Sequence, residues 1–183
     1  MLALLVCMQL MEGGAGAGRR AVGRVQLSGG GGGEERRERM RVYIHDTTLY
    51  KNASFNTAAQ AVGRSASMST ESNQFGSVYV FEDPLTIGPA RGSPTVGSAQ
   101  GMYVYTGRST FGSLWAFTAF FGKRGSISVM GGELMLFPSS RALPVVGGTG
   151  HFALARGLVN LSTLSYKAPT YFVLSLDFDL LLP

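Results

Sequence analysis

Cysteine, histidine and long uncharged runs are scarce in this chain of 183 residues. There is one cysteine, Cys7, and there are two histidines, His45 and His151. An intramolecular disulfide, a cysteine zinc cluster and a CxxC redox pair are therefore excluded, and a histidine metal centre would need carboxylate ligands as well. We expect neither a metal ion nor another cofactor.

Nucleotide motifs and membrane-length apolar runs are also missing. No GxxxxGK[ST] phosphate loop occurs, and no glycine cluster fits a strand-GxGxxG-helix unit. Charged residues or glycine interrupt each later apolar run before the roughly 18 residues that a membrane helix needs. The net charge of +5 lies partly in the first 41 residues, which contain no aromatic side chain to stack on bases. We expect no nucleic-acid and no membrane partner.

The first 40 residues differ in composition from the rest. Residues 1–11 are apolar and as long as the core of a secretory signal, but lack a basic start and a clear cleavage site, so an arbitrary apolar terminus is the alternative. Residues 12–33 are rich in Gly, Ala and Arg and cannot bury enough apolar surface to fold. We predict a leader and disordered tail over 1–40, including a solvated, mixed-charge linker at 34–39, and one folded domain over 41–183.

From residue 41 onward, apolar and polar residues alternate as in half-buried strands. The clearest strand is predicted at residues 171–182, and further strands are predicted at 42–49, 76–81, 101–106, 114–121, 126–130 and 151–161. No sustained helical stripe occurs, which argues against the crossover helices of a parallel sheet. We predict an all-β fold of seven or eight antiparallel strands. A closed barrel without exposed edges is favoured over a two-sheet sandwich, and its interior is either filled or holds a small-ligand cavity.

Two other motifs have structural interpretations. The sequence EDP at residues 82–84 predicts a strand end with a proline stop. The glycine-rich sequence GGTG at residues 147–150 only superficially resembles a phosphate loop, because a strand rather than a helix is predicted after it. We interpret it as a corner of the barrel.

Five phrases in the folded part resemble the plant dirigent proteins, and they occur in the order found in that family. They are VYIHDTTLY (42–50), FGSVYVFEDPLT (75–86), VGSAQGMYVY (96–105), GSISVMGGELM (125–135) and VVGGTGHFALARG (145–157). The resemblance covers residues 41–181. It implies an eight-stranded antiparallel β-barrel of the allene-oxide-cyclase-like kind, secreted to the apoplast and assembled as a homo-oligomer, a dimer or trimer.

The resemblance also implies a function. Dirigent proteins have no oxidative centre: a laccase or peroxidase makes phenoxy radicals from a monolignol such as coniferyl alcohol, and the barrel directs their regio- and stereoselective coupling in lignan biosynthesis. This implies an auxiliary protein rather than an enzyme, with pocket acids that protonate a quinone methide after coupling. Two alternatives stay open: a non-catalytic plant-defence module for a phenolic, lipid-like or carbohydrate ligand, and an allene-oxide-cyclase-like cyclase.

Three residues match the family's catalytic positions. Asp46 matches the first pocket acid, Glu133 stands where many members have Asp, and Arg141 matches the arginine that follows the loop. Two positions depart from the family pattern. Ser98 stands where an arginine is usual, and Ala142 stands where an acid is common.

Aromatic residues and two glycosylation sequons complete the predicted sites. The resemblance places Tyr103, Tyr105 and Phe172 at the substrate-binding surface. Tyr103 and Tyr105 share one face of a strand, so both face the interior or neither does. Asn52 (NAS) and Asn160 (NLS) are predicted glycosylation acceptors if the chain is secreted.

Overall fold

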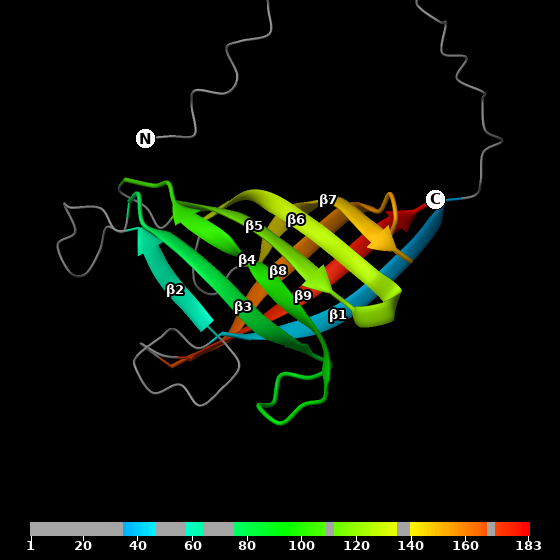
Figure 1. Cartoon of the computed structure of the whole chain (residues 1–183), viewed down its shortest axis with the longest axis horizontal. Coiled ribbons are helices and arrows are strands. Elements are labelled where there is room, and N and C mark those ends of the chain that lie inside the picture. Colours follow the sequence, from blue (N-terminus) through cyan, green and yellow to red (C-terminus); the bar gives the residue numbers. More distant parts are fainter. Residues whose placement is uncertain (1–34, 47–57, 64–74, 109–111, 135–139, 168–170) are drawn as a thin grey trace, which may run out of the picture. The chain divides into compact units, whose positions relative to one another are not determined.

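Nine β-strands make up almost all of the chain that the structure describes (Figure 1). The computed structural model describes residues 35–46, 58–63, 75–108, 112–134, 140–167 and 171–183. The strands are β1 (Arg36–Asp46), β2 (Ala58–Gly63), β3 (Val78–Thr86), β4 (Thr95–Tyr105), β5 (Gly112–Phe120), β6 (Gly125–Leu134), β7 (Arg141–Gly150), β8 (Arg156–Lys167) and β9 (Tyr171–Leu182). A short 3-10 turn, η1 (Gly122–Arg124), joins β5 to β6.

Eight of these strands close into an antiparallel barrel. Hydrogen-bonded neighbours follow the order β1-β9-β8-β7-β6-β5-β4-β3, and β3 pairs with β1 to complete the ring. On one edge of β3, β1 pairs with residues 85–86 and the short β2 pairs with residues 78–82. The predicted eight-stranded barrel is confirmed, and the sandwich alternative is wrong. The sequence missed β2 and β7.

The proline stop predicted at residues 82–84 is wrong, because β3 continues through it. On this edge of β3, the pairing with β2 ends at Glu82 and the pairing with β1 begins at Leu85, so Pro84 lies in the gap between them. Among the described strands nothing pairs with β3 between these two points, so a missing N–H removes no bond on that side. Pro144 also lies inside a strand, β7. It comes directly before Val145, the residue of β7 at which the pairing with β6 ends.

The glycine-rich corner ends β7 and begins a turn. Gly150 has a φ of +61°, a left-handed conformation in which glycine carries no Cβ penalty. Residues 151–154 form the turn, and β8 begins only at Arg156. The strand predicted at 151–161 was therefore placed too early at its start, and it extends to Lys167.

Strand β1 begins at Arg36, inside the segment predicted as a solvated linker. Residues 36–40 pair with residues 178–182 of β9. The Nε of Arg37 donates to a carboxylate oxygen of Asp179 at 2.6 Å, and Arg39 also lies beside this carboxylate. The linker interpretation fails at 36–40 because the acidic outer face of β9 supplies partners for alternate arginines. The predictions for residues 1–34 lie outside the described residues.

A chain that lacks residues 1–40 is expected to melt at a lower temperature than one that lacks residues 1–34. The longer deletion removes five strand pairs with β9 and the core contacts of Met40. A loss of about 2 kcal/mol corresponds to a shift of roughly 5 °C for a domain of this size. Thermal unfolding followed by circular dichroism measures the difference. Equal melting temperatures for the two truncated chains would contradict the pairing of residues 36–40.

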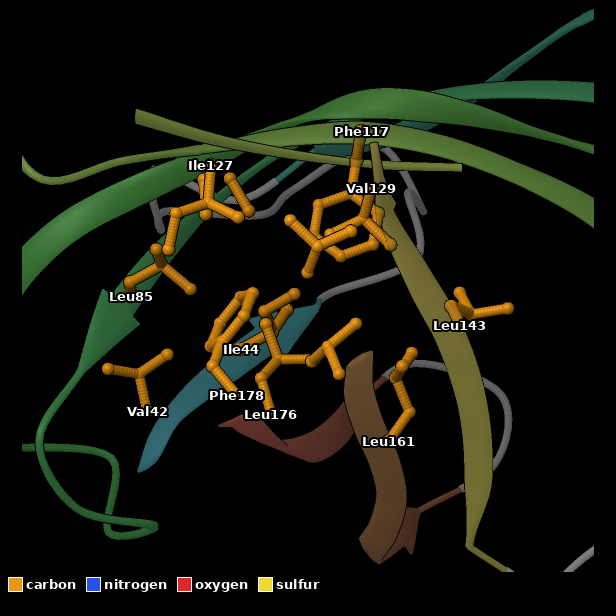
Figure 2. Close-up of a cluster of buried hydrophobic side chains, with 14 of the residues drawn as sticks. Val42, Ile44, Leu85, Phe117, Ile127, Val129, Leu143, Leu161, Leu176 and Phe178 are labelled. Atoms are coloured by element: carbon orange, nitrogen blue, oxygen red, sulfur yellow. The ribbon is translucent and has the colours of Figure 1, made fainter. Parts of the chain in front are cut away.

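Apolar side chains from all eight strands of the barrel fill its middle (Figure 2). The labelled side chains point toward one another across the interior, among them Ile44, Phe117, Leu176 and Phe178. Gly101 occupies an inward position on β4, and a Cβ there would lie 2.4 Å from the Cβ of Phe117. Along most of the barrel the interior is therefore a packed core.

Candidate active site at the polar end of the barrel

Polar inward-facing residues gather toward one end of the barrel interior. This is the end where β1, β4, β6 and β8 finish and where β5, β7 and β9 begin. The polar residues that face inward there are Asp46, Asp83, Tyr103, Tyr105, Ser113, Glu133, Arg141 and Thr163. Residues 47–57, 64–74, 109–111, 135–139 and 168–170 of the segments that connect the strands at this end lie outside the described residues. The opposite half of the interior is apolar, so this end is the candidate site.

Three aromatic rings stack across neighbouring strands at this end. Tyr103 lies between Tyr79 and Trp115, with centroid distances of 4.9 Å and 5.0 Å and interplanar angles of 9° and 15°. Tyr105 meets the edges of Tyr79 and Tyr103. The indole Nε1 of Trp115 donates to the Oγ of Ser113 at 2.9 Å. Tyr103 and Tyr105 both face the interior, in agreement with their predicted shared face, and the stack gives the site a rigid aromatic wall.

Asp46 is the last residue of β1 and stands opposite Phe172 of β9. Its Oδ1 is buried and has no hydrogen-bond partner among the described residues. Burial raises the pKa of Asp46 to about 6. Burial also raises the pKa of the Tyr103 hydroxyl, and the neighbouring Tyr105 and Asp46 raise it further. The site therefore combines a carboxyl group that titrates near neutrality with a phenol that stays protonated.

Glu133 and Arg141 form a buried ion pair across β6 and β7. The Nε of Arg141 donates to Oε2 of Glu133 at 2.6 Å, and its Nη1 donates to Oγ1 of Thr163 at 3.1 Å. The Glu133 side chain is 1% exposed, and its Oε1 has no partner among the described residues. Burial raises the pKa of Glu133, and Arg141 opposes this in part. The sequence predicted both residues but not their contact.

Asp83 is an inward-facing acid that the sequence analysis missed. It lies on β3 and is 1% exposed. The sequence EDP predicts a strand end at residues 82–84, and a residue at a strand end is not assigned to the inner or outer face of a strand. The two-residue spacing of Phe81, Asp83 and Leu85 indicates that these side chains share one face of the strand. All three are buried.

Residues 37–181 match the protein family described as "Dirigent-like protein". The chain belongs to the dirigent family. A "Dirigent protein" of Sinopodophyllum hexandrum is 36% identical over 146 residues, which are 76% of this chain and 75% of that protein. "Pterocarpan synthase 1" of Glycine max is 31% identical over 122 residues, which are 64% of this chain and 63% of that protein. The resemblance inferred from five phrases is confirmed.

A solved structure of a pterocarpan synthase dirigent protein has the same fold. It superposes with a TM-score of 0.72 and 26% sequence identity, covering 82% of this chain and 93% of that one. A second pterocarpan synthase dirigent protein gives a TM-score of 0.71 and 27% identity. The barrel described above is therefore the dirigent barrel.

The departures of this dirigent chain from the family pattern lie on its outer wall. Ser98 and Ala142 alternate with inward-facing residues of β4 and β7, so neither faces the interior. The polar end thus keeps its acids, arginine and tyrosines. Asn160 is also on the outer face, on β8, and its glycosylation stays a prediction. Asn52 lies outside the described residues.

The part of this dirigent chain that the structure describes contains no candidate metal centre and no candidate membrane helix. No group of three or more His, Cys, Asp or Glu side chains in it is placed to hold a metal ion. No helix within it has the length and apolar character needed to cross a bilayer.

The raised pKa of Asp46 predicts that stability falls as the pH rises from about 4 to about 6. In this window the folded protein binds a proton that the unfolded chain, with an ordinary pKa of 3.8, has released. The resulting loss, on the order of 2 kcal/mol, should be absent in Asp46→Asn. Urea unfolding of both proteins at pH 4 and pH 7 measures the difference between them. An identical pH dependence of the two proteins would refute the raised pKa.

Proposed function

We propose that this chain binds phenoxy radicals from a monolignol of the coniferyl alcohol type, and the quinone methide that their coupling produces, at the polar end of the barrel. There it directs the regio- and stereochemistry of bond formation. The observation that supports this most is the buried carboxyl group of Asp46, which titrates near neutral pH beside a wall of stacked aromatic rings.

The aromatic wall supplies binding and orientation. In this proposal the phenolic ring of the substrate contacts Tyr105 and Phe172, and Tyr79 and Tyr103 hold Tyr105 in place through T-shaped contacts. Holding two reacting groups in one relative orientation favours one product over its mirror image. Selectivity in this proposal comes from the fixed shape of the wall.

The acids supply the proton chemistry. A quinone methide becomes a better electrophile when its carbonyl oxygen is protonated, and Asp46 is the proposed general acid. Glu133 is held by Arg141, so its proposed role is to fix the guanidinium group in place. Radical formation is assigned to a separate laccase or peroxidase, and the protein is proposed to act in the apoplast.

A second candidate function is a cyclisation that needs no oxidant. It is favoured by the relatives whose names state pterocarpan synthesis, one at 31% identity and two with solved structures. The same acid, Asp46, would activate a quinone methide toward attack by a hydroxyl group of the same molecule. In this case the chain is an enzyme rather than an auxiliary protein.

One experiment with two arms tests both functions. In the first arm coniferyl alcohol is oxidised by a laccase with and without the protein, and the dimers are analysed by chiral chromatography. In the second arm the open-chain alcohol precursor of a pterocarpan is incubated without oxidant. An enantiomeric excess in the first arm alone supports directed coupling, and faster ring closure in the second arm supports cyclisation. Racemic dimers and no acceleration would contradict both functions and leave the binding-module and allene-oxide-cyclase-like alternatives.

The outer face of β3 to β6 is proposed as the contact between copies of the chain. Val80, Met102, Leu114 and Met130 are 37–49% exposed and neighbour one another on adjacent strands. We expect light scattering at micromolar concentration to give a dimer or trimer. The double variant Met102→Lys, Met130→Lys should be a monomer. The control variant Leu158→Lys, at an exposed residue of β8, should keep the oligomeric state. A monomeric unmodified protein would contradict the proposal.

A further inference from the structure

His45 is a buried polar residue on the outer face of the barrel. It precedes Asp46 in β1, and since neighbouring residues of a strand point to opposite faces, His45 points outward where Asp46 points inward. It is nevertheless only 5% exposed. The ring of Tyr171 stacks beside the imidazole at a centroid distance of 6.1 Å, and the guanidinium carbon of Arg91, in the turn between β3 and β4, lies 4.3 Å from the centre of the Tyr171 ring.

Both ring nitrogens of His45 have hydrogen-bond partners, one on each neighbouring strand. Nδ1 lies 2.7 Å from the hydroxyl oxygen of Tyr171 in β9, and Nε2 lies 2.9 Å from Oγ1 of Thr86 in β3. The hydroxyl group of Thr86 in turn donates to the carbonyl oxygen of Gly88 at 2.8 Å. The imidazole of β1 therefore bridges β9 and β3 from the outside of the barrel.

These contacts determine where the ring proton lies. A hydroxyl group has one proton to donate, and Thr86 gives it to a backbone carbonyl, so Thr86 must accept from an Nε2–H of His45. Nδ1 then accepts from the hydroxyl group of Tyr171. Burial lowers the pKa of His45, the carbonyl of Gly88 opposes this in part, and Arg91 adds to the lowering. Geometry and electrostatics both favour a neutral imidazole with its proton on Nε2.

The bridge lies at the seam where β1 meets β3. Among the described residues the backbone pairing of these strands comprises two residue pairs and ends at Ile44. The bond from His45 to Thr86 extends the connection to the residue directly before Asp46. Asp46 itself is paired with β9, opposite Phe172. The place of its carboxyl group therefore depends on how firmly the end of β1 is held between β3 and β9.

We propose that His45 is a positioning residue for Asp46: its neutral imidazole ties the end of β1 to both neighbouring strands from outside and so fixes the carboxyl group of Asp46 against the aromatic wall inside. This inference rests on the proposed function of the polar end. It gives a role to a residue that faces away from the interior. A general acid must stand within hydrogen-bond reach of the atom it protonates, and a displacement of 1 Å can lower a rate about 100-fold.

The imidazole bridge can be tested in the unmodified protein by 15N NMR of the ring nitrogens. The chain has two histidines, and His151, whose side chain is 34% exposed, serves as the reference. At pH 7 we expect His45 to be neutral and to carry its proton on Nε2. A proton on Nδ1, or a charged ring, would overturn the proposal.

The variant His45→Leu removes both hydrogen bonds but keeps an apolar side chain in their place. We expect the rate of directed product formation to fall about 100-fold. We also expect the pKa of Asp46 to move from about 6 toward its ordinary value of 3.8, because a loosened end of β1 admits water to the carboxyl group. A titration followed by NMR of 13C-labelled aspartate carboxyl carbons measures this shift, and the spectrum of Asp46→Asn identifies the signal. Asp177, on the outer face of β9, should titrate unchanged.

Two further variants separate positioning from a general loss of stability. His45→Gln offers an amide donor and a carbonyl acceptor, so it should keep most of the rate and the raised pKa of Asp46. Tyr171→Phe removes one bond and should fall between His45→Leu and the unmodified protein in both measurements. If His45→Leu does not fold, as judged by near-ultraviolet circular dichroism, Tyr171→Phe and the 15N spectrum still decide. An unmoved Asp46 titration in folded His45→Leu would overturn the role of His45.

Failure of the proposed function gives a different result. If the unmodified protein directs no reaction but His45→Leu moves the titration of Asp46, the positioning by His45 holds and the proposed function is wrong. If the protein is active and folded His45→Leu keeps both its rate and its Asp46 titration, the function stands and the positioning is wrong.

Discussion

Replacement of Asp46 by asparagine is expected to lower the yield of the stereochemically directed product roughly 100-fold, the usual scale for a lost general acid. Asparagine keeps the size of the side chain but has no carboxylic proton to donate. Burial holds the pKa of Asp46 at about 6, so the native side chain is a competent donor near neutral pH. The measurement is product yield and enantiomeric excess with a laccase as the radical source.

Two further variants make this result interpretable. Asp177→Asn removes a carboxyl group from the outer face of β9 and should leave yield and excess unchanged. Glu133→Gln should lower the product yield less than Asp46→Asn, because Arg141 already binds the Glu133 carboxyl group. An Asp46→Asn protein that matches the unmodified protein in both yield and excess would rule out an acid role, and selectivity would then come from shape alone.

Replacement of Arg141 by methionine is expected to destabilise the barrel by about 3–5 kcal/mol at neutral pH. The Glu133 side chain is 1% exposed, so loss of the guanidinium group leaves a buried carboxyl group without its counterion. Thr163 also loses a donor. The loss should be smaller at acid pH, where Glu133 can bind a proton. Urea unfolding at pH 5 and pH 7 measures both effects.

The double variant Glu133→Gln, Arg141→Met separates the cost of an orphaned charge from the value of the ion pair. Removal of both charges should recover most of the stability, because replacing a buried ion pair by uncharged groups of similar volume is often neutral. If the double variant is as unstable as Arg141→Met, the loss of stability comes from the packing of the arginine side chain rather than from its charge.

The alternation of apolar and polar residues predicted most of the barrel strands. In β9 the pattern is so regular that its predicted bounds, residues 171–182, are those observed. It failed where backbone features interrupt the pattern. Pro144 and the glycines at 147–148 concealed β7, and the arginine-rich start of β1 looked like a linker because its partners, Asp177 and Asp179, are about 140 residues away.

The site shows the same division between local and distant information. Tyr103 and Tyr105 were assigned to one face because spacing along a strand determines the direction of side chains. The Glu133–Arg141 contact was not predictable, since it depends on how β6 and β7 align. The sequence does not single out Asp83, because its neighbours in sequence, Glu82 and Pro84, suggest a strand end.

The sequence by itself determined the fold class and family of this protein, because period-two patterns and the five dirigent phrases are local properties of the chain. Only the tertiary structure decided that β1 closes the ring on β3, and that Glu133 and Arg141 form an ion pair across β6 and β7. Register between strands far apart in the chain is set by the packing of the whole core, which no single segment encodes. The buried ion pair of the candidate site depends on that register.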